Sequence, residues 1–87
     1  MYVVIVYDVG IERVNSIRKF LRMFLNWVQN SVFEGELTRS ELERVRFGIK
    51  NLVDESEDSV RIYAFRSERV VKRIVIGQEK GFVENIV

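Results

Sequence analysis

The first stretch of the chain ends in an acidic residue that a buried strand does not need. YVVIVYDVG, residues 2–10, runs from apolar and aromatic residues into Asp8, with a glycine two places later. An unpartnered carboxylate that is removed from water costs more free energy than the margin by which a small domain is folded. Asp8 therefore needs a partner. Either it accepts backbone N–H bonds as a turn residue or cap of a following helix, or it binds a cation.

The chain contains neither cysteine nor histidine. These absences exclude disulfides, thiolate nucleophiles and zinc–thiolate sites, and they remove imidazole as a general base. Any chemistry must therefore use carboxylates, hydroxyls, amines and a cation that prefers oxygen ligands, such as Mg²⁺ or Mn²⁺. A single carboxylate holds Mg²⁺ weakly, because the ion prefers an octahedron of oxygen ligands.

Two copies of Asp8 would form a better cation site than one. Asp8 shares a strand face with Tyr2, Val4 and Val6, since side chains alternate along a strand. If two chains pack through this face, two carboxylates about 4 Å apart repel by about 1 kcal/mol even in water. Such a pair shares a proton or binds a cation. A divalent metal held by Asp8 and its symmetry partner would therefore give this carboxylate a partner, and the role as a turn or cap residue stays open as the alternative.

Hydrophobic periodicity predicts the elements that position Asp8. Residues 2–7 predict a central strand with apolar side chains on both faces. A stripe with helical spacing predicts a helix from about residue 11 to residue 25. The stripe consists of Val14, Ile17, Leu21 and Phe24. Residues 26–35 predict extended chain, either one strand with a bulge near Asn30 or two short strands with a tight corner there.

A second helix has a clear start signal. Thr38 and Glu41 form a capping box, and Leu37 with Leu42 supplies the flanking hydrophobic staple. Its buried stripe consists of Leu42, Val45, Ile49 and Leu52. Gly48 lies within this helix at a cost of about 1 kcal/mol relative to alanine, which indicates close packing.

The remainder of the chain predicts a strand and a tail. Residues 59–65 alternate as a half-buried strand. The tail, residues 66–87, contains two short apolar runs at 73–77 and 82–87, of which one is expected to form an added edge strand. The chain has no internal repeat and no low-complexity linker, so residues 1–87 are expected to form a single domain.

The order of elements fits the ferredoxin-like βαββαβ plan, an α+β fold in which two helices cover one face of a small sheet. This plan leaves the other face bare. Because the first strand is apolar on both faces, we expect the bare face to pack against a second copy of the chain, giving a homodimer. The added C-terminal strand would then be exchanged with the partner's sheet edge.

Basic residues are segregated although the net charge is only +1. They gather in residues 13–22 and 61–73, which indicates basic patches suited to nucleic acid, although each cluster alone is more typical of a solvated face. Glu34 and Glu36 are the nearest spare acids to Asp8 by motif, and we expect them in a solvated loop. No apolar run is long enough for a membrane span and no secretory signal is visible, so a cytoplasmic location is expected.

Four features of the chain, taken together, are typical of one protein family. They are YVVIVYDVG at residues 2–10, Arg13 and Asn15 at the start of a basic helix, VQNSVFEGELT at 28–38, and DSVRIYAF at 58–65. In these features the chain resembles the Cas2 family of small CRISPR-associated proteins of spacer acquisition, over residues 1 to about 77. The resemblance implies a ferredoxin-like homodimer and a metal-dependent endonuclease site in which Asp8 is the catalytic residue, shared across the two-fold axis.

The resemblance also implies a partner, the Cas1 integrase, whose dimers are bridged by the Cas2 dimer while it supports the DNA duplex of a new spacer. Two functions remain open: hydrolysis of single-stranded RNA or duplex DNA with Mg²⁺ or Mn²⁺, and duplex binding without catalysis. A toxin-type ribonuclease of the same fold is a further alternative. Tyr7 and Ser31 are candidate hydroxyls near the metal. The candidate nucleic-acid contacts are Arg13, Arg18, Lys19, Arg22, Arg61 and Arg66.

Overall fold

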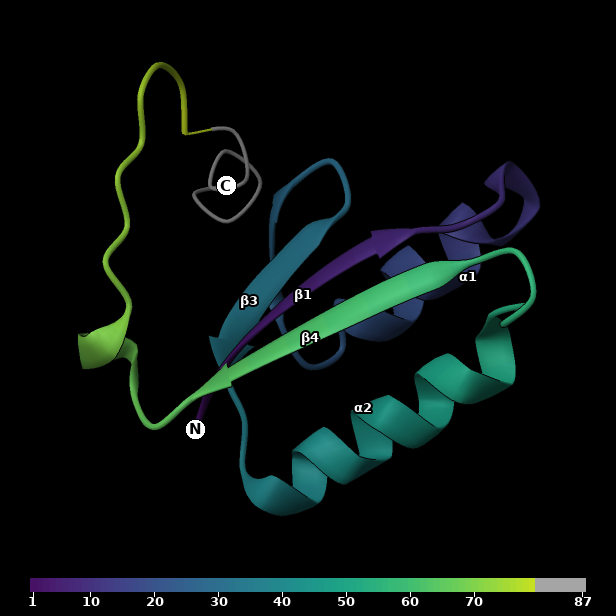
Figure 1. Cartoon of the computed structure of the whole chain (residues 1–87), viewed down its shortest axis with the longest axis horizontal. Helices are drawn as coiled ribbons and strands as arrows, with labels where there is room; N and C mark the ends of the chain where they lie inside the picture. Colours follow the sequence, from purple (N-terminus) through teal and green to yellow (C-terminus); the bar gives the residue numbers. More distant parts are fainter. Residues whose placement is uncertain (80–87) are drawn as a thin grey trace.

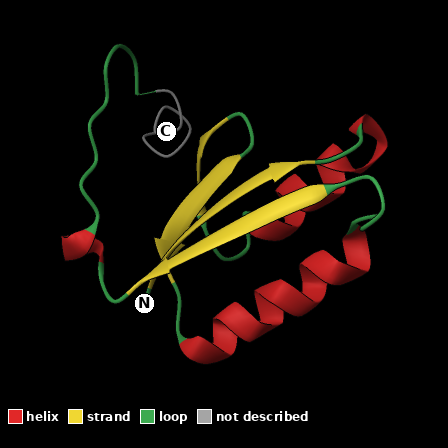
Figure 2. Ribbon diagram, in the orientation of Figure 1, coloured by secondary structure: helices red, strands yellow, loops and turns green. Residues whose placement is uncertain are grey.

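Four antiparallel strands form one sheet in the spatial order β2-β3-β1-β4, and two helices cover one of its faces (Figure 1). The computed structural model describes residues 1–79. The elements are β1 (Tyr2–Asp8), α1 (Ile11–Leu21), β2 (Asn26–Gln29), β3 (Val32–Glu36), α2 (Arg39–Leu52), β4 (Ser59–Phe65) and a short 3₁₀ helix, η1 (Glu68–Val70). In Figure 2, which has the orientation of Figure 1, α1 passes behind the strands and α2 runs alongside β4. The predicted ferredoxin-like α+β order is confirmed.

The two faces of β1 have different surroundings. Val3, Ile5 and Tyr7 point toward the helices and are 0–4% exposed. The opposite side, here called the open face, consists of Tyr2, Val4, Val6 and Asp8 of β1 with their cross-strand neighbours Val32, Glu34 and Glu36 of β3 and Ser59, Arg61, Tyr63 and Phe65 of β4. Val6 and Tyr63 are 36% and 45% exposed on this face. The face is therefore partly apolar, and no helix among the described residues covers it.

Helix α1 ends one turn earlier than its periodicity predicts. The backbone tightens after Leu21, where the N–H groups of Met23 and Phe24 donate to carbonyls only three residues back, at 3.1 and 3.0 Å. Bonds of this type form a narrower turn than an α-helix. The turn brings Leu25, 6% exposed, into the core and directs the chain into β2.

The extended segment after α1 combines both predicted forms. It folds as two short strands with a tight corner, and Asn30 at the corner has a positive φ of 40°. A register irregularity also occurs between Trp27 and Gln29 in the β2–β3 pair. The Trp27 indole donates a hydrogen bond to the Asn30 carbonyl at 3.0 Å, which holds the corner closed.

The predicted second helix and last core strand are confirmed. Thr38 and Glu41 form the capping box, with reciprocal hydrogen bonds of 2.8 and 3.1 Å. One of the two apolar runs of the tail was expected to form an added edge strand. Residues 73–77 form no strand, and the other run, residues 82–87, lies outside the described part of the chain. No helix in residues 1–79 is both long enough and apolar enough to cross a membrane.

Replacing Gly48 with alanine is expected to lower the free energy of unfolding by up to about 2 kcal/mol. A Cβ at this position of α2 would lie 2.6 and 2.7 Å from two ring carbons of Phe20 on α1. Such overpacking costs about 1–3 kcal/mol, which exceeds the gain of about 1 kcal/mol in helix propensity. Urea unfolding measures the change. Phe20→Leu should cost less in the alanine background than in the wild type; equal costs in both would contradict a clash with this ring.

Candidate functional site

Asp8 ends β1 on the open face and is exposed to solvent. Its cross-strand neighbour is Ser59, the first residue of β4. Within residues 1–79 its carboxylate has no hydrogen bond or ion pair. The alternative role as a helix cap is wrong, because the cap position of α1 is occupied by Gly10 and no side chain caps it there. The carboxylate is therefore available to a ligand or to a second subunit.

The acidic residue that does secure the start of α1 is Asp58, which lies just before β4. Its side chain is 1% exposed and accepts hydrogen bonds from Arg13 Nε at 2.5 Å and from Arg13 Nη2 at 2.8 Å. It also accepts the backbone N–H groups of Gly10 and Asp54, each at 2.9 Å. The hydrogen bonds from Arg13 hold the pKa of the Asp58 carboxyl well below its usual range, although burial opposes this effect.

Arg13 was predicted as a nucleic-acid contact, and the structure gives its guanidinium a partner within the chain. The ion pair with Asp58 raises the pKa of Arg13, and the side chain is only 20% exposed. Glu57 and Glu12 lie 3.7 Å from the same guanidinium. Much of the positive charge of Arg13 is therefore compensated locally.

Neither of the two candidate hydroxyl residues, Tyr7 and Ser31, lies on the strand face that carries Asp8. Tyr7 points to the opposite face of β1, beneath the helices, where its ring stacks on Phe33 with centroids 6.2 Å apart. The Tyr7 hydroxyl is buried and has no hydrogen-bond partner among the described residues. Ser31 lies in the β2–β3 corner, where its carbonyl accepts the Tyr7 backbone N–H at 3.1 Å. Alternation along β1 thus separates the Tyr7 hydroxyl from the Asp8 carboxylate.

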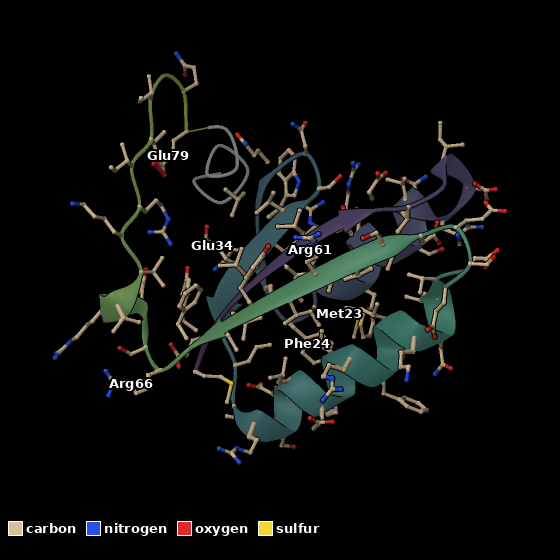
Figure 3. All side chains as sticks on the ribbon, viewed as in Figure 1. Met23, Phe24, Glu34, Arg61, Arg66 and Glu79 are labelled. Carbon is tan, nitrogen blue, oxygen red and sulfur yellow. The ribbon has the colours of Figure 1, made fainter. Side chains whose placement is uncertain are left out.

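The predicted basic residues fall into separate groups. Lys19 and Arg22 are exposed on and just after α1, while the Nε atom of the half-buried Arg18 has no hydrogen-bond partner in residues 1–79. Arg61 lies on the open face two residues from Ser59, and a hydrogen bond to the Tyr63 side chain raises its pKa. Arg66 follows the other end of β4 (Figure 3). One subunit therefore presents basic residues on the helical side and on the open face.

Glu34 and Glu36 lie on strand β3, so their prediction as loop residues is wrong. Glu34 is 13% exposed and accepts a hydrogen bond from the Tyr2 hydroxyl at 2.7 Å. The guanidinium of Arg73, in the tail, contacts both Glu34 and the Tyr2 hydroxyl. Burial, followed by the bond to Glu34, raises the pKa of the Tyr2 phenol. Glu34 thus anchors the tail and lies opposite Val4, well along the strand from Asp8.

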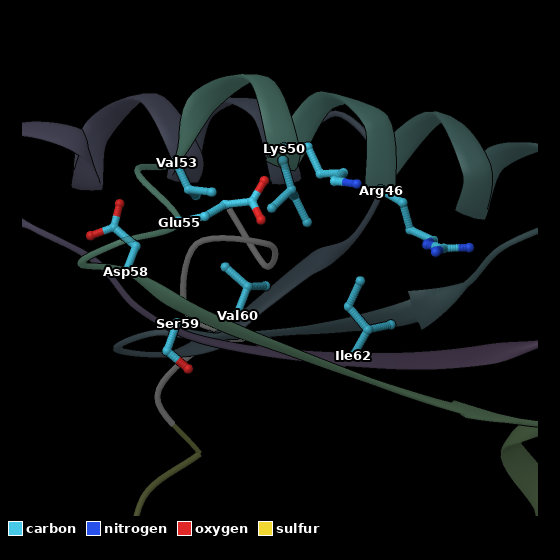
Figure 4. Close-up of a pocket in the computed structure, with 9 residues that line it drawn as sticks. Arg46, Lys50, Val53, Glu55, Asp58, Ser59, Val60 and Ile62 are labelled. Carbon is cyan, nitrogen blue, oxygen red and sulfur yellow. The ribbon is translucent and has the colours of Figure 1, made fainter.

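A pocket of 410 Å³ lies between α2 and β4, close to the Asp8 end of the sheet (Figure 4). Figure 4 places Arg46 and Lys50 above it on the helix and Val60 and Ile62 below it on the strand, with Asp58 at one end. The pocket is lined by basic and acidic side chains, and its floor is apolar. Val60 and Ile62 belong to the helical side of β4, so the pocket is separated from the open face by the strand itself.

A metal site at Asp8 needs oxygen ligands from more than one chain. No group of three acidic, histidine or cysteine side chains in residues 1–79 is placed to hold a metal ion. Asp8 by itself offers one carboxylate in water, which is weak for Mg²⁺. Its exposure and its lack of an internal partner fit a ligand role only if a second subunit brings another carboxylate to it.

Comparison with known proteins finds matches over most or all of the chain. A family model described as "CRISPR associated protein Cas2" matches residues 1–73. A protein of Pyrococcus furiosus described as "CRISPR-associated endoribonuclease Cas2" is 58% identical over the full length of both chains. A protein of Methanocaldococcus jannaschii with the same description is 55% identical over all of this chain and 76% of its own length.

Solved structures agree with these sequence matches. A structure described as "Crystal structure of cas2" has a TM-score of 0.84 and 46% identity, covering 92% of this chain and 90% of its own. The Cas2 structure of Streptococcus pyogenes has a TM-score of 0.72 and 30% identity, covering 86% of this chain and all of its own. The predicted family is confirmed by sequence and by fold: the chain belongs to the Cas2 family of CRISPR-associated proteins.

Proposed function

We propose that this chain is a homodimeric, metal-dependent endoribonuclease whose two Asp8 side chains form one shared site. The observation that carries the proposal is the position of Asp8, an exposed carboxylate at the end of a partly apolar sheet face with no hydrogen bond or ion pair within residues 1–79. The description of the relatives as endoribonucleases supports RNA as the substrate. Single-stranded RNA is the form that we propose, with duplex DNA as the alternative.

Exposed apolar residues support the dimer. Val6 and Tyr63 lie uncovered on the open face, and in the tail Ile74 and Ile76 are 73% and 94% exposed. Burying apolar surface stabilises association by about 25 cal/mol for each Å² removed from water. A small domain gains proportionally more from such burial because it covers less of its own surface. We infer that the open faces pack together and that the tails exchange.

The two carboxylates of Asp8 would hold Mg²⁺ or Mn²⁺ between the subunits. When bound, such a cation supplies a coordinated water of lowered pKa and neutralises charge on the scissile phosphate. Arg61 lies beside Val6 in the register and close to Asp8 on the same face, where its guanidinium can hold a phosphate oxygen of the substrate. The chain has no histidine, so proton transfer is left to water and to carboxylate, hydroxyl or amine groups.

The test is cleavage of a labelled single-stranded RNA and of a matched DNA duplex by the purified protein. Cleavage should require Mg²⁺ or Mn²⁺, should stop when a chelator is added, and should resume when the metal is restored. Activity that persists in excess chelator would contradict the proposal. The same assays on an Asp8→Asn variant, purified in the same way, exclude a contaminating nuclease.

A second function, a DNA-binding bridge beside the Cas1 integrase in the cytoplasm, is favoured by the basic side chains on and just after α1. Lys19 on the helix and Arg22 just after it are exposed, and a two-fold axis doubles every such group. Contacts of lysine and arginine to phosphate need no base recognition, which suits a protein that supports duplexes of any sequence. This function and the nuclease use different faces of the subunit and are compatible.

Replacing Lys19 and Arg22 together with glutamine is expected to weaken duplex binding and reduce its salt dependence. Each lost phosphate contact should lower the slope of log K against log salt by about 0.9. Fluorescence anisotropy with a labelled duplex, at several salt concentrations, measures both effects. Arg39→Gln with Arg46→Gln removes equal charge from α2 and serves as the control. Equal losses in the two double variants would indicate net charge rather than a binding surface.

A further inference from the structure

The ion pair of Arg13 with the buried Asp58 lies next to the strand end that carries Asp8, because Ser59, which pairs with Asp8, directly follows Asp58. We propose that Asp58 and Arg13 are positioning residues for the Asp8 site, which fix the direction in which the Asp8 carboxylate leaves the sheet. This inference rests on the proposed function, because it assigns the ion pair a role in the same site. It also gives Arg13 a role other than phosphate binding.

A short closed ring of chain segments, which includes the backbone of Asp8 and the side chain of Asp58, connects the end of β1 to the start of β4. Asp8 pairs with Ser59 across the β1–β4 register, and Ser59 directly follows Asp58 in the chain. The Asp58 carboxylate accepts the N–H of Gly10 at 2.9 Å, and Gly10 lies two residues after Asp8. The ring therefore runs from Asp8 to Gly10, across to Asp58 and Ser59, and back to Asp8. A shift of the Asp58 carboxylate would displace both ends of the segment that holds Asp8.

Asp58 is itself fixed from three directions. Arg13 donates two hydrogen bonds from the first turn of α1, Gly10 donates from the β1–α1 turn, and Asp54 donates from the α2–β4 turn. The carboxylate is 1% exposed, so water cannot replace a lost donor without rearrangement. Because the pairing is bidentate, the Arg13 guanidinium fixes the orientation of the Asp58 carboxylate as well as its distance, which a lysine cannot do.

The Asp8 side chain depends on this support because no hydrogen bond or ion pair within the described residues holds it. Its carboxylate is exposed and makes no hydrogen bond within residues 1–79, so its direction is set by the backbone beneath it. In the dimer, two such carboxylates must meet closely enough to share one cation. A displacement of about 1 Å in a catalytic geometry can cost about 100-fold in rate. Loss of the ion pair should therefore act mainly on catalysis.

Two variants test the inference in the full-length dimer. Asp58→Asn keeps the shape of the side chain and removes its charge, and Arg13→Lys keeps the charge and removes the bidentate geometry. Each should lower kcat for RNA cleavage by about 10- to 100-fold, leave KM nearly unchanged, and raise the Mn²⁺ concentration needed for half-maximal rate. The salt dependence of duplex binding should stay unchanged in Arg13→Lys.

A matched destabilised variant separates positioning from simple loss of stability. Ile17→Val removes one methyl group from the core of α1, and assays are run well below the melting temperature of every variant. It should keep wild-type kcat and metal dependence, as should Glu43→Gln, which breaks the exposed ion pair with Arg46. The inference is overturned if Ile17→Val lowers kcat as much as Asp58→Asn does. It is also overturned if Asp58→Asn and Arg13→Lys both keep wild-type kcat.

Mn²⁺ titration by calorimetry tests the inference independently of cleavage. If the wild type cleaves RNA through Asp8 and Asp58→Asn has no effect on rate or on Mn²⁺ affinity, the inference fails and the proposed function stands. If the wild type does not cleave but binds Mn²⁺ through Asp8, and Asp58→Asn weakens that binding, the function fails and the inference stands. A wild type that does neither contradicts both.

Discussion

Asp8→Asn is expected to abolish metal-dependent RNA cleavage while leaving fold and duplex binding nearly intact. The side chain is exposed and unbonded within the described residues, so an amide of the same shape should cost little stability. The substitution removes a negatively charged ligand from the proposed cation site. Because metal stabilisation of the transition state is worth several kcal/mol, the cleavage rate should fall by at least about 10³-fold. Cleavage of labelled RNA, thermal unfolding and fluorescence anisotropy measure the three properties.

Mixed dimers determine whether the two Asp8 side chains act together. Wild-type and Asp8→Asn chains, carrying different tags, are exchanged to equilibrium in equal amounts. If both carboxylates are needed, only dimers with two wild-type chains are active, and activity falls to about one quarter of the wild-type value; independent sites would retain about one half. The purified mixed dimer should be inactive. A mixed dimer with half of the wild-type activity would exclude a shared site.

Local sequence signals predicted most of the fold. The capping box of Thr38 and Glu41 placed the start of α2 correctly, because both partners lie within one turn of chain. Alternation placed Asp8 on the face of Tyr2, Val4 and Val6, as the register shows. Gly48 indicated close helix packing, and the helix layer indeed leaves no room for a Cβ beside Phe20.

Interactions between distant parts of the chain could not be predicted in the same way. Asp8 and Asp58 are both aspartates at the margin of a strand, and the sequence gives no reason to bury one rather than the other. The partners of Asp58 lie 45 and 48 residues away, so only the folded sheet brings Arg13 and Gly10 to it. The early end of α1 likewise reflects the need to bring Leu25 into the core, which overrides the apolar spacing. Arg13 was therefore assigned to nucleic acid on its charge alone.

Val6→Lys is expected to dissociate the dimer and to abolish cleavage with it. Val6 is 36% exposed on the open face and lies two residues from Asp8 on the same strand. If two Asp8 side chains meet at the two-fold axis, Val6 must lie inside the interface, where each subunit would now bury an unpaired ammonium group. Desolvating such a charge costs several kcal/mol, so the dimer dissociation constant should rise by at least about 100-fold. Sedimentation velocity over a range of concentrations measures it.

Phe47→Lys is the matched control, because it introduces the same side chain at an apolar position of α2 that is 70% exposed on the helical side. This variant should remain dimeric and active, since that surface faces away from the proposed interface. The isolated Val6→Lys subunit should stay folded, because the core beneath Val3, Ile5 and Tyr7 is untouched. It should also lose Mn²⁺ binding, because each subunit then offers a single carboxylate. A Val6→Lys protein that remains dimeric would place the interface elsewhere and remove the physical basis for a shared Asp8 site.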